Sequence, residues 1–266
     1  MAHIVSIVTI NFNNANGLKK TINSILSQTY KEYEFVIVDG RSVDESRSII
    51  ESSIKLFPSF SWVSERDGGI YDAMNKGVRL SSGEYCIFMN SGDCFYNEKS
   101  LFESEKYLHA DWEIVSGSVV TDNFSKKPPL PSDLSLSFFL KDSMNHQSTF
   151  IKRQLLLDYP YNENRRIVGD TEFFFNVLIL KNVSYIQIPV IVSYCEVAGE
   201  SGDLKKSLEE RYIAIKELLP SRMATDVDFI VKYHNPIVIG IGNVLYRKGL
   251  RRLFYIFNKW KRRINR

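Results

Sequence analysis

Asp67 and Asp93 delimit a short stretch that combines the residue types needed to bind a charged ligand. After Asp67, the pair Gly68-Gly69 offers bare backbone and precedes a helical pattern, whose N-terminal amides favour negative charge. The hydrophobic run 85–89 is typical of a buried strand, and polar residues follow it up to Asp93. In open α/β sheets, ligands bind where strands end and helices begin. Because a carboxylate there can hold a divalent cation against a diphosphate, the stretch predicts an enzyme site for a nucleotide-linked substrate.

Two further acids, Asp39 and Asp44, lie at and just after the end of an earlier predicted strand. A carboxylate offers only acceptors, so an Asp at a strand end can accept hydrogen bonds from a base or a ribose. Each acid alone is better explained as a helix cap or turn residue, but acids at successive strand ends of one sheet favour a shared site. Asn75 and Lys76 lie one turn into the helix after Gly69, within reach of a ligand, and a solvated surface charge is the alternative for Lys76.

The elements that must position these residues alternate between strand and helix over the first 120 residues. Strands are expected at 4–10, 34–38, 61–64, 85–89 and 113–120, with helices between them. This alternation predicts a parallel sheet with right-handed crossovers. Beyond a proline-rich loop at 121–132, we expect a short strand at 148–152, a helix at 170–181, strands at 185–194 and helices from residue 207.

Composition limits the class of protein. The 266 residues are 44% hydrophobic, enough for a full core. Cys86, Cys94 and Cys195 form no CxxC pair, which argues for a reducing compartment and against a disulfide or zinc framework. We find no signal-peptide pattern and no apolar run of the roughly 20 residues that a membrane span requires.

Several motifs resemble those of the inverting family-2 glycosyltransferases of the GT-A fold, and most of all bacterial enzymes of colanic-acid and O-antigen biosynthesis. The matching segments are residues 9–13 (TINFN), 24–30 (SILSQTY), 38–44 (VDGRSVD), 67–77, 88–93, 146–147 (HQ) and 168–170 (VGD). The likeness covers about residues 3–200 and is most specific up to Asp93.

The resemblance implies an α/β fold with a GT-A (Rossmann-like), mostly parallel sheet flanked by helices. It places a glycosyltransferase domain at residues 1–205, with a nucleotide-binding half at about 1–120 and an acceptor half at about 121–205. Residues 206–266 would form a helical C-terminal region that ends in a basic tail.

The resemblance also implies roles for single residues. Thr9, Asn11, Asp39 and Asp67 would hold the base and ribose of a UDP-like donor. The full set of expected donor-binding residues is Thr9, Asn11, Asp39, Asp67, Gly68, Gly69, Asn75, Lys76, Ser91 and Asp93. Asp170 matches the acid that deprotonates the acceptor hydroxyl, and Glu172 is the fallback base. From the residues alone, Asp170 is equally a cap of the apolar helix that follows it.

The acidic metal motif departs from the family pattern. Asn90-Ser91-Gly92-Asp93 stands where many members have Asp-Ser-Asp-Asp, so two carboxylates are missing. The expected cofactor is a divalent cation, Mn²⁺ or Mg²⁺, bound by Asp93 with His146 as a further candidate ligand. In the alternative arrangement, basic side chains such as Lys76 take part of the cation's role. As a lone histidine, His146 is also well explained as a satisfied polar residue.

A basic segment ends the chain. From Phe229 onward there are ten Lys and Arg and no acid, whereas the remainder has 24 Lys and Arg against 31 Asp and Glu. Apolar residues at steps of four and three form one stripe of a predicted helix: Tyr246, Leu250, Leu253, Phe257, Trp260 and Ile264. A basic amphipathic helix of this kind predicts that residues 243–266 bind an anionic membrane surface. An oligomerisation or core helix is the alternative, and no nucleic-acid partner is expected because no recognition fold accompanies the charge.

These features together predict a peripheral enzyme on the cytoplasmic face of a bacterial inner membrane. It would transfer a sugar from a nucleotide-sugar donor to a lipid-linked oligosaccharide of O-antigen, capsule or exopolysaccharide. The expected donor is a UDP-sugar. One alternative is a non-catalytic assembly subunit that keeps the GT-A fold, because the acidic motif is depleted. The other is a nucleotidyltransferase, which would be expected to carry an arginine-rich triphosphate loop, but residues 11–17 (NFNNANG) hold no Arg.

Overall fold

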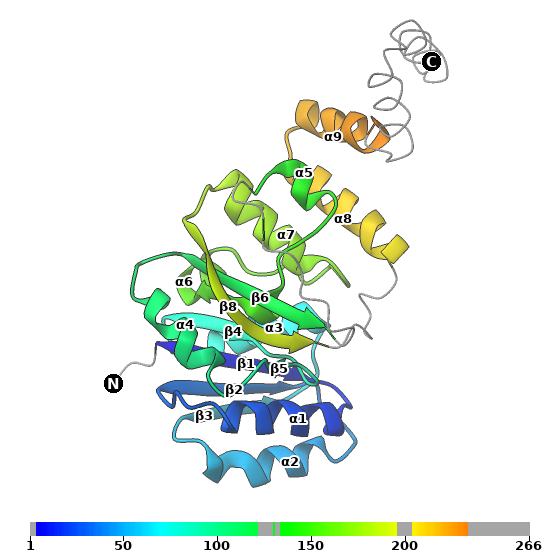
Figure 1. Cartoon of the computed structure of the whole chain (residues 1–266). Coiled ribbons are helices and arrows are strands. Elements are labelled where there is room, and N and C mark those ends of the chain that lie inside the picture. The colour runs from blue at the N-terminus through cyan, green and yellow to red at the C-terminus, as the bar shows by residue number, and fades with distance from the viewer. Residues whose placement is uncertain (1–3, 122–129, 131–133, 196–203, 234–266) are drawn as a thin grey trace, which may run out of the picture. The chain divides into compact units, whose positions relative to one another are not determined.

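The computed structural model describes residues 4–121, 130, 134–195 and 204–233, and its centre is an eight-stranded sheet (Figure 1). The strand order is β3-β2-β1-β4-β7-β6-β8-β5. The strands are β1 (Val5–Asn11), β2 (Tyr33–Asp39), β3 (Phe60–Ser64), β4 (Tyr85–Phe88), β5 (Cys94–Phe95), β6 (Ile114–Thr121), β7 (Thr149–Lys152) and β8 (Tyr185–Cys195). The α/β class predicted from the alternating pattern is confirmed.

The predicted helices occur in the predicted order, and two short helices at 136–139 and 153–158 were not predicted. The helices are α1 (Ala15–Leu26), α2 (Ser46–Ser53), α3 (Ile70–Leu80), α4 (Ser100–Leu108), α5 (Leu136–Phe139), α6 (Arg153–Asp158), α7 (Gly169–Phe175), α8 (Leu204–Leu218) and α9 (Ser221–Tyr233). Short 3₁₀ turns occupy Ile54–Leu56 and His146–Ser148. The helix expected at 170–181 is present in two parts, because α7 ends at Phe175 and continues as a π-helical turn at Asn176–Leu180.

Strand direction agrees with the prediction in one half of the sheet and differs in the other. β1, β2, β3 and β4 are parallel neighbours, as are β6 and β8. However, β7 runs antiparallel to both β4 and β6, and β5 runs antiparallel to β8. β7 follows the 3₁₀ turn His146–Ser148 rather than a long crossover helix, and only parallel neighbours need such a crossover. The sheet is therefore mixed and mostly parallel.

The position of Asp93 also differs from the prediction. β4 ends at Phe88, so Asp93 lies five residues beyond the strand, in the turn directly before β5, instead of at a strand end. Gly92 has a φ of 110°, a conformation that side-chain-bearing residues rarely adopt. The turn closes through a hydrogen bond from the Asp93 amide to the Asn90 carbonyl (2.8 Å).

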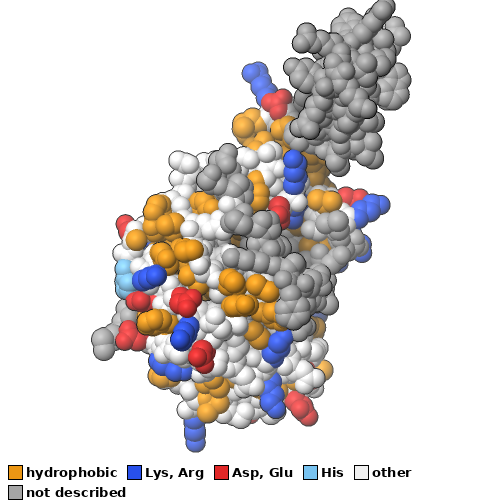
Figure 2. Space-filling model, viewed as in Figure 1, with side chains coloured by type: hydrophobic (Ala, Val, Ile, Leu, Met, Phe, Trp, Pro, Cys, Tyr) orange, Lys and Arg blue, Asp and Glu red, His pale blue; other side chains and the backbone are white. Residues whose placement is uncertain are grey.

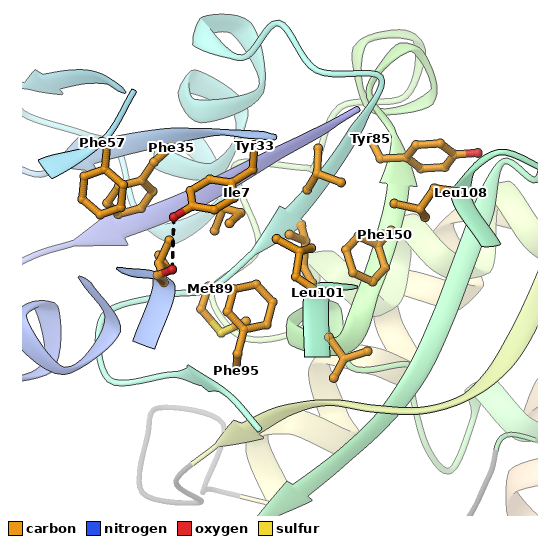
Figure 3. Packing of buried hydrophobic residues seen from close by; sticks show 14 of the residues in the cluster. Ile7, Tyr33, Phe35, Phe57, Tyr85, Met89, Phe95, Leu101, Leu108 and Phe150 are labelled. Carbon is orange, nitrogen blue, oxygen red and sulfur yellow. Dashed lines mark hydrogen bonds between the residues drawn. The ribbon is translucent and has the colours of Figure 1, made fainter. Parts of the chain in front are cut away.

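The main core lies between the sheet and helices α1, α2 and α4. Side chains on one face of the strands, such as Ile7, Phe35 and Ile37, join Leu18 and Ile25 of α1 in a buried cluster (Figure 3). Within it, the Tyr33 hydroxyl donates to the Ile25 carbonyl (3.1 Å), which ties β2 to the end of α1. Val8 points to the opposite face, where α3 packs on β1 and β2. This layering places the starts of α1 and α3 beside the carboxyl ends of β1 and β2.

Contacts divide the chain into residues 1–214, which contain the whole sheet, and residues 215–266. The predicted domain boundary at 205/206 stays a prediction. The predicted membrane-binding tail, 243–266, lies outside the described residues, as does most of the loop 121–132. Within the described residues, no helix is both long and apolar enough to cross a bilayer. On the face shown in Figure 2, basic and acidic side chains are intermingled over the described residues.

Candidate active site

A cleft of about 1300 Å³ lies at the carboxyl ends of β1, β2 and β4. The loops after these strands, the start of α3, residues 141–147, the start of α7 and one face of α8 line it. It brings together eight of the predicted site residues: Asn11, Asp67, Gly68, Gly69, Ser91, Asp93, His146 and Asp170. The cleft exceeds the roughly 300–1,000 Å³ that one small ligand needs, so it has room for two substrates.

Asp39 ends β2 and is fully buried, and four hydrogen bonds saturate its carboxylate. Oδ1 accepts from Asn11 Nδ2 (2.8 Å) and Ser42 Oγ (2.6 Å), and Oδ2 accepts from the Ser42 amide (3.0 Å) and Ser64 Oγ (2.7 Å). Burial alone would raise the pKa of Asp39, but these hydrogen bonds outweigh it and hold the pKa below its usual value. Asp39 does not line the cleft, so it acts on a ligand through the neighbours that it fixes.

Asn11 carries this network to the cleft surface. Its Nδ2 donates to Asp39, while its Oδ1 accepts from Ser91 Oγ (2.8 Å) in the turn after β4. Both Asn11 and Ser91 line the cleft. The ends of β1, β2 and β4 are therefore joined by side-chain hydrogen bonds before any ligand binds.

We call Asn11, Asp39 and Asp67 the nucleotide edge of the cleft. Of its two acids, Asp67 is the one that faces the cleft. Burial raises its pKa above the usual value, while the Gly69 amide and the Lys76 ammonium lower it. Gly69 is the N-terminal cap of α3 with a φ of 139°, and a Cβ added there would meet no atom within 4 Å. The start of α3 thus offers open backbone beside a carboxylate, as the pair Gly68-Gly69 predicts.

Asp44 has a structural role, since its carboxylate caps two helices. Oδ2 accepts from the Ala15 amide (2.9 Å) at the start of α1, and Oδ1 accepts from the Ser46 amide (3.0 Å) at the start of α2. The capping alternative noted for single acids is the one that fits Asp44.

Asp170 lies in the first turn of α7, at the edge of the cleft. Its Oδ1 accepts from the Thr171 amide (2.7 Å) and, at 3.4 Å, from the Tyr71 hydroxyl. Its Oδ2 lies 3.0 Å from His146 Nδ1. The helix begins at Gly169, so Asp170 is not its cap, and the carboxylate is oriented from both sides.

The hydrogen bonds of His146 specify its tautomer. Nε2 lies 3.3 Å from Asn90 Nδ2, an amide donor, so Nε2 acts as the acceptor. The proton of the neutral ring is then on Nδ1, which donates it to Asp170. Both ring nitrogens are engaged by side chains, so His146 orients Asp170 in this arrangement, and a cation would have to displace Asn90 to reach Nε2.

The residues present fit a cation that arrives with a diphosphate better than a preformed metal centre. No group of three or more His, Cys, Asp or Glu that could hold a metal occurs in the described part of the chain. Asp93 supplies one carboxylate at the cleft wall, and burial raises its pKa. Mg²⁺ is commonly bound by one or two carboxylates, water and substrate phosphates, and Asp93 satisfies that minimal requirement.

Besides Asp39, four predicted residues do not line the cleft. Thr9 is buried and donates to the Met89 carbonyl (2.7 Å). Asn75 Nδ2 donates to the Tyr161 carbonyl (2.9 Å), and Asn75 Oδ1 accepts from the Tyr161 amide (3.0 Å). Lys76 is paired with Glu65 (3.0 Å) and Asp72 (3.1 Å), and Glu172 is paired with Arg165 and accepts from Asn162 (3.0 Å). These positions give Thr9 and Asn75 supporting roles, and of the two candidate bases only Asp170 lines the cleft.

Sequence reasoning missed one cleft residue with unusual chemistry, Arg211 on α8. The signal was present as a lone arginine between Ser207 and Ala214 on the buried side of an amphipathic helix. A charge on such a face needs a functional or structural partner.

The family model for glycosyl transferase family 2 matches residues 6–165, which is more than half of the chain. The chain belongs to glycosyl transferase family 2. The match spans the strand-end loops, Asn90–Asp93 and His146, and stops just before Asp170. This family-2 chain is a glycosyltransferase, so the nucleotidyltransferase and non-catalytic alternatives are set aside.

Curated relatives agree with this family. A PGL/p-HBAD biosynthesis glycosyltransferase of Mycobacterium bovis is 29% identical over 211 residues, covering 76% of this chain and 81% of the relative. An uncharacterized glycosyltransferase of Mycobacterium tuberculosis is 27% identical over 230 residues, covering 79% of this chain and 86% of the relative.

Solved structures show the same fold. S. aureus TarS 1–349 in complex with UDP-GlcNAc has a TM-score of 0.64 at 16% identity, over 84% of this glycosyltransferase and 70% of that chain. The Pyrobaculum calidifontis mannosyltransferase PcManGT in complex with GDP-Man and Mn²⁺ has a TM-score of 0.63 at 15% identity, over 98% and 83%. The predicted GT-A fold is thereby confirmed.

Proposed function

We propose that this glycosyltransferase transfers a sugar from a UDP-linked donor to a lipid-linked oligosaccharide, with inversion at the anomeric carbon. The observation that carries the proposal is the position of Asp170, whose carboxylate is oriented by His146 and the Thr171 amide in the cleft that the nucleotide-edge residues line. An oriented carboxylate beside a nucleotide site is what direct attack by an acceptor hydroxyl requires.

The nucleotide edge supports a nucleoside diphosphate donor. Asn11 and Asp67 present hydrogen-bonding groups, and Phe12 is 65% exposed beside them, so its ring is free to contact a planar base. Structural neighbours in complex with UDP, UDP-GlcNAc and GDP-Man have related folds. UDP is our first choice because it matches the donor that the sequence motifs imply.

In the proposed reaction, the acceptor hydroxyl donates its proton to Asp170 as its oxygen attacks the anomeric carbon. The bond between that carbon and the phosphate oxygen breaks, and the nucleoside diphosphate leaves. His146 keeps the Asp170 carboxylate aimed through Nδ1–H, and Asn90 keeps His146 in that tautomer. A divalent cation, Mn²⁺ or Mg²⁺, would be held by Asp93 and would supply positive charge to the leaving diphosphate.

The lipid-linked acceptor is proposed from the sequence and the relatives. The mycobacterial relative is a glycosyltransferase of PGL/p-HBAD biosynthesis. The basic amphipathic pattern at 243–266 suits attachment to an anionic leaflet, which would place the cleft near a membrane-bound acceptor at the cytoplasmic face of a bacterial inner membrane.

A donor screen tests the proposal. Calorimetry of the full chain with UDP, GDP and a panel of UDP- and GDP-sugars, with and without Mn²⁺, should give binding of a UDP-linked donor. Binding of GDP-sugars alone would move the proposal to another donor class, and no nucleotide binding under either condition would refute it.

A vesicle assay tests the membrane part separately. Deleting residues 243–266 should leave nucleotide binding intact and abolish sedimentation with anionic vesicles, while neutral vesicles recover neither protein. For the full chain, recovery should fall as salt is raised, because ions screen the attraction. Equal recovery of the full and truncated chains with anionic vesicles would contradict attachment through this segment.

A further inference from the structure

Arg211 lies on the packed face of α8. Ser207 is one turn before it and Ala214 is three residues after it, and both are buried. Residues at these spacings share a helix face, so Arg211 projects from the inner side of α8 and lines the cleft with Ser207. An arginine at such a position must be desolvated in part, and this has a free-energy cost that exposed arginines do not carry.

The neighbouring residue fixes where this arginine lies. The Glu210 carboxylate accepts hydrogen bonds from the Arg166 amide (2.7 Å) and the Ile167 amide (3.2 Å). These amides belong to the segment that leads into α7 and Asp170. Glu210 therefore holds α8 against the catalytic side of the cleft.

The guanidinium of Arg211 lacks a full set of partners. Its Nε is buried and makes no hydrogen bond within the part of the chain that the structure describes. Burial lowers the pKa of Arg211, and the charges of Asp142 and Asp170 oppose that shift without bonding the Nε. A second buried polar atom of the cleft, Asn90 Oδ1, is also without a partner.

Of the basic residues near the cleft, Lys76 and Arg165 are already neutralised, while Arg41, Arg66, Lys141 and Arg166 line the cleft together with Arg211. Lys76 is held by Glu65 and Asp72, and Arg165 is held by Glu172. The sequence alternative, in which Lys76 stabilises the diphosphate, would require two ion pairs to break. Arg211 needs no such rearrangement.

We propose that Arg211 binds a phosphate group in the catalytic cleft. The planar guanidinium fork matches phosphate geometry, and hydrogen bonds between ionised partners are the stronger kind. The proposal rests on the proposed function, because a diphosphate leaving group needs positive charge and the motif at 90–93 supplies a single carboxylate for a cation. The phosphate belongs either to the donor diphosphate or to the acceptor, and the test separates these sources.

The test is calorimetry of the full chain with UDP, uridine and inorganic pyrophosphate, comparing wild type with Arg211→Met and Arg211→Lys. If Arg211 binds the donor phosphates, Arg211→Met weakens UDP binding about 10- to 100-fold, the size expected for hydrogen bonds between charged groups. Uridine binding stays unchanged, and Arg211→Lys recovers part of the UDP affinity. Lys205→Met, at an exposed position on the same helix, should leave both affinities unchanged.

Pyrophosphate added to the UDP-saturated protein tests whether the phosphate bound by Arg211 belongs to the acceptor. If UDP affinity is unaffected but Arg211→Met loses binding of this added pyrophosphate, Arg211 serves an acceptor phosphate. If the variant binds UDP and pyrophosphate as the wild type does, the proposal is wrong, whereas the proposed function stands. If wild type binds neither UDP nor uridine, the UDP assignment fails, and pyrophosphate binding alone then decides the role of Arg211. Arg211→Lys keeps the comparison available should Arg211→Met fail to fold.

Discussion

The two sides of the cleft differ in how completely their polar groups are paired. On the nucleotide edge, the buried carboxylate of Asp39 has four internal donors, and Asn11 is bonded through both ends of its amide. On the reaction side, Asp170 and His146 are bonded to each other, but Asn90 Oδ1 and Arg211 Nε are buried without hydrogen-bond partners among the described residues.

This difference separates a preorganised surface from one that a ligand completes. Internal hydrogen bonds fix the shape of the nucleotide edge in advance, which reduces the ordering that binding requires. Unpaired buried groups carry a desolvation penalty that a complementary ligand removes. We therefore expect substitutions on the nucleotide edge to change stability, and substitutions on the reaction side to change turnover.

The largest effect is expected for Asp170→Asn. Loss of the base should lower kcat about 10²- to 10⁴-fold, while the dissociation constant of UDP stays within a factor of two to three of wild type. Asn keeps the side-chain shape but lacks the basic oxygen. Steady-state kinetics and UDP titration on the same preparation check both parts, and a variant with normal turnover would remove Asp170 from its role.

The next effect concerns the residue that positions the base. His146→Leu removes the donor to Asp170 and should lower kcat by up to about 100-fold, the size that misplaced catalytic groups produce. His146→Asn is the matched variant, because its amide nitrogen occupies nearly the place of Nδ1 and can still donate. We expect it to recover much of kcat without changing KM for the donor. Equal losses in the two variants would indicate a role in packing instead.

A smaller effect is expected at the cation-binding carboxylate. Asp93→Asn should remove the part of the UDP affinity that depends on Mn²⁺, on the order of tenfold if one charge-assisted contact is lost. Affinity measured in chelator should be the same as in wild type. An unchanged dependence on Mn²⁺ would show that Asp93 does not hold the cation.

The smallest effect on turnover, and a clear one on stability, is expected on the nucleotide edge. Asp39→Asn should lower the free energy of unfolding by about 1–3 kcal/mol at pH 7, because an amide cannot accept all four hydrogen bonds. The folded-state pKa of Asp39 is lowered, so its stabilisation is present above the unfolded pKa of about 3.9. The difference between variant and wild type should shrink as the pH falls through the folded pKa.

Substitution of Asp67 is expected to change folding stability in the opposite direction, so Asp67 serves as the control for Asp39. Burial raises its folded-state pKa, so ionisation of Asp67 costs folding stability, and the relative stability present at acid pH is lost as the pH rises through that pKa. Asp67→Asn should therefore be more stable than wild type at pH 7 and lose this advantage below about pH 4. Urea unfolding of both variants at several pH values checks the pair, and shifts of the same sign at neutral pH would contradict it.

Sequence motifs predicted residues that the fold brings to one cleft, because the motifs mark strand ends that a parallel sheet gathers at one edge. Asn11, Asp67, Ser91 and Asp170 lie far apart in the chain yet share one cleft. The antiparallel strands β5 and β7 were beyond such reasoning, since a short apolar run has no direction of its own.

The direction of individual side chains was harder to predict than their neighbourhood. Asn75 lies one turn into α3, as expected. However, its side chain binds the backbone of Tyr161, which is 86 residues away in the chain. The position of Arg211 in the cleft could be recognised only from the structure, in which α8 lies beside the segment that leads into α7. Both cases depend on tertiary contacts that neither spacing nor charge pattern encodes.

The most direct test of the central claim is the stereochemistry of transfer. Purified full-length protein would be incubated with the UDP-sugar that binds best and a lipid extract of the source cells, and NMR would follow the anomeric signals of donor and first product. We predict a product whose anomeric configuration is inverted from the donor, released with one UDP per transfer and absent with Asp170→Asn. A product that retains the donor configuration would contradict direct displacement assisted by Asp170.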